Sequence, residues 1–109
     1  GDAVLAPGRG RLDIPGALLD LSLASGIPAV FPASFYVGYG GLASYGTDYY
    51  AEGFQAARLL ARLLRGARPD ELPVESADKL DVAVNLKTAD LLGLAVPRKV
   101  LLRADTLRR

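Results

Sequence analysis

The sequence contains no cysteine and no histidine. Without these residues the chain cannot form a Cys/His metal site, a Ser-His-Asp triad or a thiol nucleophile. Metal sites made only of carboxylates remain open, but the 12 acidic residues are scattered and form no convincing ligand spacing. We therefore expect a protein that is not an enzyme and that uses no metal or other cofactor.

Long apolar runs and a strong net charge are also absent. No run approaches the roughly 18 apolar residues of a membrane-spanning helix. The formal net charge is only +1, so no global positive field recruits nucleic acid, and we expect no nucleic-acid partner. Half of the 109 residues are hydrophobic, which indicates a folded protein with one modest core rather than a disordered chain.

Short apolar segments alternate with segments of helical spacing in the first half of the chain. Residues 3–6 and 27–31 form continuous apolar runs, and residues 16–24 between them have the apolar spacing of a helix that Gly26 ends. This order predicts an α/β fold with a parallel sheet. Residues 33–39 contain three aromatic side chains in a short loop or helical turn, either as packing at the edge of the core or as a stacking wall for a ligand.

The stretch from Gly40 to Gly46 is the best candidate for a ligand site. An apolar strand there ends in Ser44, Tyr45 and Gly46, directly before a predicted helix. In α/β folds ligands bind at the carboxyl ends of strands, beside helix N-termini. The alternative is a plain strand-to-helix connection without a ligand. Ser44 and Tyr45 alternate, so we expect at most one of them to enter the core, and we predict that Tyr45 lines the cleft.

The second half of the chain begins with the clearest helix of the sequence, residues 48–65. Thr47 or Asp48 can cap it, and one broad side of it is apolar. Residues 80–85 alternate in polarity, as in a strand near a sheet edge, and Asn85 can cap a short helix at residues 86–92. Pro97 opens a last helix in which Val100, Leu101, Ala104 and Leu107 point inward and the arginines outward.

Three motifs occur in a familiar order: GLASYG at residues 41–46, RGARPDELPVE at residues 65–75 and VAVNLKTADLLGL at residues 82–94. The chain resembles the C-terminal part of the ABC-transporter substrate-binding family that includes members binding tryptophan and other aromatic amino acids. Ala43 stands where that family usually has Met, and Thr47 where Pro is common. The loop at residues 7–11 lacks the Asp-Pro that members often carry there.

The resemblance implies a type I periplasmic-binding-protein fold, in which two Rossmann-like α/β lobes close on a ligand. By this analogy residues 1–46 belong to the second lobe, residues 47–79 to the first lobe, and residues 80–109 return to the second. The start at Gly1 lies in the middle of an αβ unit, so we expect the chain to be part of a longer protein. Apolar surface would then be exposed or covered by self-association.

The implied function is that of the solute-binding component of an ABC transporter. It would bind a small molecule, with an amino acid as one candidate, and deliver it to the permease subunits in the membrane. The resemblance implies a periplasmic location, or export with a membrane anchor, although this chain contains no signal peptide. The candidate ligand-binding residues are Ser44, Tyr45, Gly46, Ser34, Phe35, Gly8 and Arg9.

Two other functions remain open from the sequence. The same fold serves as the effector-sensing lobe of transcription regulators and receptors. A small α/β enzyme that uses only carboxylates is the third reading, and the scattered acidic residues argue against it. For Arg9, pairing with a ligand carboxylate competes with the simpler role of a solvated loop residue.

Overall fold

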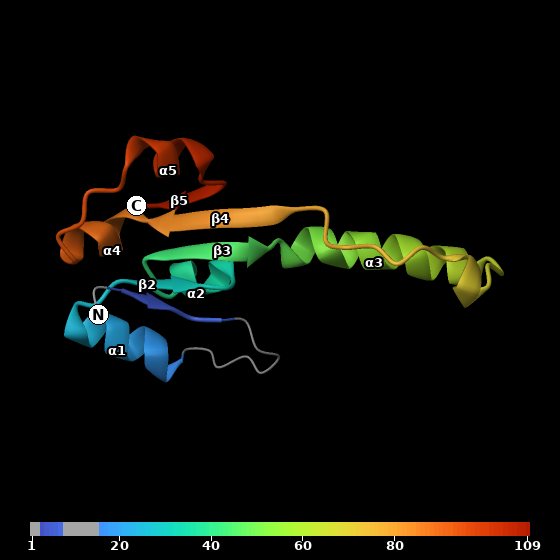
Figure 1. Cartoon of the computed structure of the whole chain (residues 1–109), viewed down its shortest axis with the longest axis horizontal. Coiled ribbons are helices and arrows are strands. Elements are labelled where there is room, and N and C mark those ends of the chain that lie inside the picture. The colour runs from blue at the N-terminus through green and yellow to red at the C-terminus, as the bar shows by residue number, and fades with distance from the viewer. Residues whose placement is uncertain (1–2, 8–15) are drawn as a thin grey trace. The chain divides into compact units, whose positions relative to one another are not determined.

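The computed structural model describes residues 3–7 and 16–109 (Figure 1). The chain divides into two compact units, which are treated separately below. Unit 1 consists of Gly1–Gly46 and Asp81–Arg109, and unit 2 consists of Thr47–Leu80. The assignment of these segments to the two lobes of a larger fold stays a prediction. No described helix is long and apolar enough to cross a membrane.

Unit 1 is built on a mostly parallel sheet, which confirms the predicted α/β fold. Its five strands follow the chain in the order β1-β2-β3-β4-β5: β1 Val4–Leu5, β2 Ala29–Phe31, β3 Ala43–Thr47, β4 Leu80–Asn85 and β5 Thr106–Arg108. β1 pairs with β2, β2 with β3, and β4 with β5, all in parallel. Figure 1 shows β3 and β4 pointing in opposite directions, and the Asn85 N–H donates to the Leu42 carbonyl at 2.8 Å.

The core of unit 1 lies between this sheet and α1, Ala17–Ser25. Leu19 of α1 packs against Ala29 and Phe31 of β2, and all three are at most 2 % exposed. Gly26 ends α1 with φ of 70°, a left-handed conformation that glycine adopts without a steric penalty. The predicted strand–helix–strand order is therefore present, and it sets the carboxyl ends of β1 and β2 at one edge of the sheet.

The aromatic segment after β2 forms a short helix, α2, Ser34–Gly38. The ring of Tyr36 stacks on Phe31 with a centroid distance of 5.0 Å and contacts Phe35 at 4.5 Å. The Gly41 N–H donates to the Tyr36 carbonyl at 2.8 Å, which holds the start of the next strand segment against α2. Two of the three aromatic rings in this segment are thus used for packing at the edge of the core.

The C-terminal elements differ in part from the prediction. Asn85 caps α4, Leu86–Leu91, as expected, but α5, Arg98–Arg103, ends earlier than the helix predicted to include Leu107. Leu107 lies in β5 instead. Asp105 explains the change, because its N–H donates to the Val82 carbonyl at 2.7 Å and its carboxylate accepts from the Val82 N–H at 2.8 Å. These bonds align the last residues beside β4, so β5 is the edge strand and β4 lies next to it, near the edge as expected.

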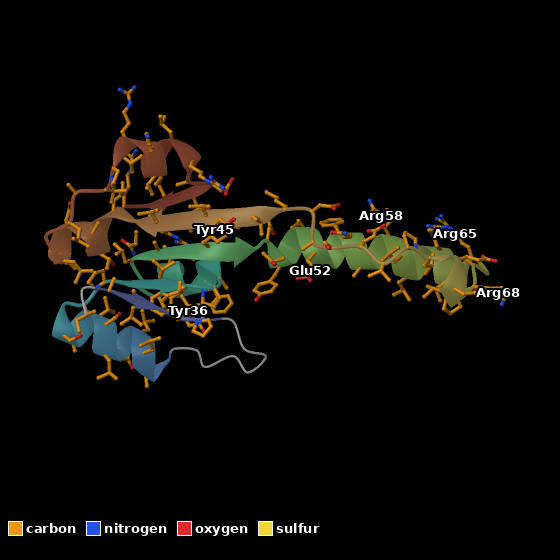
Figure 2. All side chains as sticks on the ribbon, viewed as in Figure 1. Tyr36, Tyr45, Glu52, Arg58, Arg65 and Arg68 are labelled. Carbon is orange, nitrogen blue, oxygen red and sulfur yellow. The ribbon has the colours of Figure 1, made fainter. Side chains whose placement is uncertain are left out.

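Unit 2 consists of α3, Tyr49–Leu64, the 3₁₀ helix η1, Pro69–Glu71, and an extended segment. Gln55 and Arg58 on the polar side of α3 hold this segment, since both side chains donate to Glu75 at 2.9 and 3.0 Å. Figure 2 labels Arg58 on α3. The apolar side carries exposed rings and aliphatic groups: Tyr50 is 79 %, Phe54 65 % and Leu64 80 % exposed. Unit 2 therefore keeps a broad apolar surface of its own.

Asp48 makes the stability of unit 2 vary with pH in the acidic range. The backbone N–H of Ala51 and, next, the Lys79 ammonium hold the pKa of Asp48 below its ordinary value. A carboxylate with a lowered pKa in the folded state stabilises the fold above its unfolded-state pKa, and this stabilisation is lost as the pH falls through the folded-state pKa. We expect the helical signal of α3 in circular dichroism to melt at a lower temperature at pH 3 than at pH 6.

The matched variant is Asp48→Asn, which retains an acceptor for the Ala51 N–H but cannot form the ion pair with Lys79 at 3.2 Å. Its melting temperature should change less between the two pH values than that of the wild type. Since the pKa of Glu75 is also lowered, mainly by the amide of Gln55, the variant keeps part of the pH dependence. An identical pH profile in wild type and variant would show that Asp48 does not contribute.

Candidate functional site

The candidate site lies at the carboxyl end of β3 in unit 1. Ser44 is 2 % exposed and faces the core, where its register partner on β2 is Phe31. Tyr45 points to the opposite face of the sheet and is 50 % exposed (Figure 2). This is the alternation that an extended strand requires. The hydroxyl of Ser44 has no hydrogen-bond partner among the described residues, although it is fully buried.

Gly46 lies inside β3, whereas the sequence analysis placed it at the end of the strand, where a glycine usually indicates a turn. It is not one of the described glycines with positive φ, so left-handed backbone is not the reason for glycine here. The reason is close approach: a Cβ on Gly46 would lie 1.9 Å from the Pro32 carbonyl oxygen. The chain just after β2 therefore touches the end of β3 so closely that no side chain fits between them.

This contact brings further candidate residues to the same edge of the sheet. Ser34 and Phe35 follow Pro32 directly, at the first turn of α2. Ser34 is exposed, while Phe35 is half-buried and its ring contacts Tyr36. Gly8 and Arg9 lie outside the described residues. The described part of the site thus offers the exposed hydroxyl of Ser34, the half-exposed ring of Tyr45 and the backbone groups of Gly46.

The loop that leads into β3 is held by a polar network that begins on β4 and α4. The Asn85 side chain accepts from the Thr88 N–H at 3.0 Å and donates to the Val37 carbonyl at 3.2 Å. The Thr88 hydroxyl, which is buried, donates to the Gly40 carbonyl at 2.8 Å. The sequence identified Asn85 only as a helix cap. Its second role, fixing the segment between α2 and β3, depends on long-range pairing that the sequence does not show.

A groove beside Tyr45 was not predicted. It has a volume of about 440 Å³ and is lined by Tyr45 on β3, Val82 on β4, and Lys99, Val100 and Arg103 on α5. From the sequence, the arginines of this last helix were expected to point outward. In the sequence, the spacing of four residues between Lys99 and Arg103 indicates that both cations lie on one side of a helix.

The chemistry of these groups is that of binding. The described residues contain no cluster of three or more acidic side chains that could hold a metal ion. Hydroxyl groups, aromatic faces, backbone groups and two cations can orient and hold a small molecule.

Comparison with known proteins identifies the family of this chain. Residues 14–108 match the family model described as ABC transporter substrate binding protein. A comparison with curated proteins gives no match.

Three solved structures are similar to the chain. A conserved domain protein from Vibrio cholerae O1 biovar El Tor has 34 % sequence identity and a TM-score of 0.75, over 84 % of this chain and 31 % of that one. An ABC domain in complex with L-Trp from Streptococcus pneumoniae has 28 % identity and a TM-score of 0.80, over 97 % of this chain and 37 % of that one.

The third structure is a ligand-free, open form of a substrate-binding protein with adhesive properties from Clostridium difficile. It has 23 % identity and a TM-score of 0.61, over 84 % of this chain and 30 % of that one, and it shows similarity of fold alone. The chain thus spans about a third of the length of each of these structures. Because the family model covers nearly the whole sequence, the chain belongs to the ABC transporter substrate-binding protein family.

Proposed function

We propose that this chain is the C-terminal portion of the solute-binding component of an ABC transporter. The observation that carries the proposal is the match of residues 14–108 to the substrate-binding family. The fold similarity to the L-Trp complex, over 97 % of this chain, supports it. In this proposal the protein binds a small molecule between two lobes and delivers it to membrane permease subunits, from the periplasm or from an anchored position outside the membrane.

We propose an amino acid as the solute, and the carboxyl ends of β2 and β3 as the part of the cleft that this chain supplies. The candidate contacts are the ring and hydroxyl of Tyr45, the Gly46 backbone, Ser34 and Phe35. Gly8 and Arg9 would extend the site from the loop after β1. The unpartnered Ser44 hydroxyl supports a polar role for that residue, but its burial means that a solute reaches it only after a local rearrangement.

The proposal requires residues beyond this chain, since the compared structures are about three times as long. Other parts of the same protein would then cover the exposed apolar side of α3 and complete the cleft. The chain produced alone would self-associate through this side, because exposed apolar patches of such width are rare on soluble monomers.

The test is isothermal titration of the longer protein with L-tryptophan and a panel of other amino acids, in the wild type and in Tyr45→Ala. We expect saturable binding of at least one amino acid. Loss of the Tyr45 ring should weaken it about tenfold, the scale of one aromatic contact or hydrogen bond. Thermal stability should change little, because the ring is already half exposed.

The matched control is Tyr49→Ala, which removes a tyrosine of α3 that is exposed to a similar degree and is not a candidate contact. It should leave affinity unchanged. The proposed site is wrong if Tyr45→Ala binds normally. The proposed solute class is wrong if the folded wild-type protein binds no amino acid.

A further inference from the structure

The groove beside Tyr45 combines a positively charged wall with an apolar floor. Lys99 and Arg103 are four residues apart, so both project from one side of α5. Val100 lies between them, and Val82 of β4 and the ring of Tyr45 complete the lining. All five residues belong to unit 1. Its volume of about 440 Å³ lies within the usual range of small-molecule sites, roughly 300–1,000 Å³.

Among the described residues, neither cation forms an ion pair with an acidic side chain. Within residues 3–7 and 16–109 no ion pair or hydrogen bond engages the side chain of Lys99 or Arg103. The acidic residue that follows α5, Asp105, uses its carboxylate to accept from the Val82 N–H at 2.8 Å. No carboxylate belongs to the lining of the groove in the part of the chain that the structure describes. Two adjacent cations without a partner attract an anion, and an arginine can bind a carboxylate through two parallel hydrogen bonds.

The rest of the lining selects the body of the ligand. Two valines and a tyrosine ring favour an apolar group, and the Tyr45 hydroxyl can donate one further hydrogen bond. An ammonium group, in contrast, would meet two positive charges and no carboxylate among the described residues that line the groove. We infer that this groove binds a small organic carboxylate that has an apolar body and carries no cationic group.

This inference does not rest on the proposed function, because it assigns a different ligand class to a groove that shares only Tyr45 with the proposed solute contacts. An α-amino acid carries an ammonium beside its carboxylate, so the groove should discriminate against it. Arylalkanoic acids and branched-chain fatty or keto acids have the required chemistry. The site would recognise such acids on unit 1 alone, without lobe closure.

The experiment uses the longer protein at neutral pH and low salt, where the carboxylate is ionised and its attraction to cations is weakly screened. Three probes share one ring: indole-3-propionate, its neutral amide and L-tryptophan. Amide chemical shifts in ¹⁵N-labelled protein follow the titration. We expect saturable binding of indole-3-propionate, with the largest shifts at residues 45, 82 and 99–103. At the groove, as followed by the shifts of residues 82 and 99–103, the amide and L-tryptophan should each bind at least about tenfold more weakly.

The variants Lys99→Gln and Arg103→Gln should each weaken the binding of indole-3-propionate roughly fivefold to tenfold. Arg98→Gln is the matched control, because it removes the same charge from α5 at an exposed position that does not line the groove. It should change the affinity less than about twofold. All three positions are exposed, so the variants should fold, which thermal unfolding verifies.

Several results would overturn the inference. Equal losses in Arg98→Gln and in the groove variants would mean a diffuse attraction of anions to the basic surface. Equal binding of the amide would mean that the cations do not recognise the ligand. Binding of L-tryptophan at the same residues and with the same affinity would mean that the groove is part of the solute site, and absence of saturable binding would mean that it is not a ligand site.

Discussion

Replacement of Gly46 by alanine should lower the free energy of unfolding of unit 1 by about 3 kcal/mol, the upper range for an overpacked position. The new methyl carbon would lie 1.9 Å from the carbonyl oxygen of Pro32 and 2.9 Å from its carbonyl carbon. Both are backbone atoms, so the strain cannot be relieved by a rotation of a side chain. Either β3 or the segment after β2 must move.

The matched control is Gly53→Ala, the same chemical change at a glycine of α3 with no atom within 4 Å of the added carbon. Alanine is the better helix former, so this variant should stabilise α3 by about 0.5–1 kcal/mol. Chemical denaturation measures both effects. Circular dichroism follows the loss of helix, and tyrosine fluorescence follows the loss of tertiary structure. The close approach of Pro32 to Gly46 is refuted if Gly46→Ala is as stable as the wild type.

The movement that Gly46→Ala imposes also bears on the site. Ser34 and Phe35 follow Pro32, so a shift of this segment displaces two candidate contacts together with the end of β3. A variant that stays folded at low temperature should bind the solute of the longer protein more weakly than Tyr45→Ala does. Loss of binding would then reflect the geometry of the edge and not the loss of one side chain.

The sequence predicted the elements whose signals are local. Asp48 and Asn85 were identified as helix caps because a polar residue before a helical segment supplies the missing acceptor, and both accept from the N–H three residues later. The apolar runs and the glycine after α1 were also sufficient to predict the parallel β1–α1–β2 arrangement. These features depend on residues that are close together in the chain.

The features that the sequence did not predict depend on residues far apart. Leu107 has the spacing of a helical core position, but the double hydrogen bond of Asp105 with Val82 makes the same segment a strand. Gly46 looks like a turn residue, and only the position of Pro32 shows that its role is close contact. The groove needs β3, β4 and α5 at once, so a linear pattern shows its two cations but not its floor.

For the candidate site, the sequence predicted the orientation of two side chains but not which of them contacts a ligand. Alternation along β3 was enough to predict that Ser44 and Tyr45 face opposite sides. Under the proposed function, which of the two contacts a solute also depends on other parts of a longer protein, because the compared structures are about three times as long. The roles of Ser44, Tyr45, Gly46, Ser34 and Phe35 in binding therefore stay predictions that titration must decide.

Replacement of Asn85 by alanine should destabilise unit 1 by about 2 kcal/mol, because its side chain makes two separate hydrogen bonds that are both lost. The first is the cap of α4, worth about 1 kcal/mol, since the Thr88 N–H loses its acceptor at 3.0 Å. The second is the bond to the Val37 carbonyl at 3.2 Å, also worth about 1 kcal/mol in a partly buried position. Lys87→Ala, an exposed change on the same helix, should stay within about 0.5 kcal/mol of the wild type.

Asn85→Asp tests the two losses independently, because the carboxylate can still accept from the Thr88 N–H but cannot donate to the Val37 carbonyl. We expect it to be less destabilising than Asn85→Ala, by about the 1 kcal/mol that the cap contributes. Combining Asn85→Ala with Thr88→Val removes both the Val37 bond and the bond from Thr88 to the Gly40 carbonyl at 2.8 Å. Both bonds hold the segment between α2 and β3, so the double variant should show a coupling above about 0.5 kcal/mol. Strict additivity would mean that the two bonds act on this segment independently.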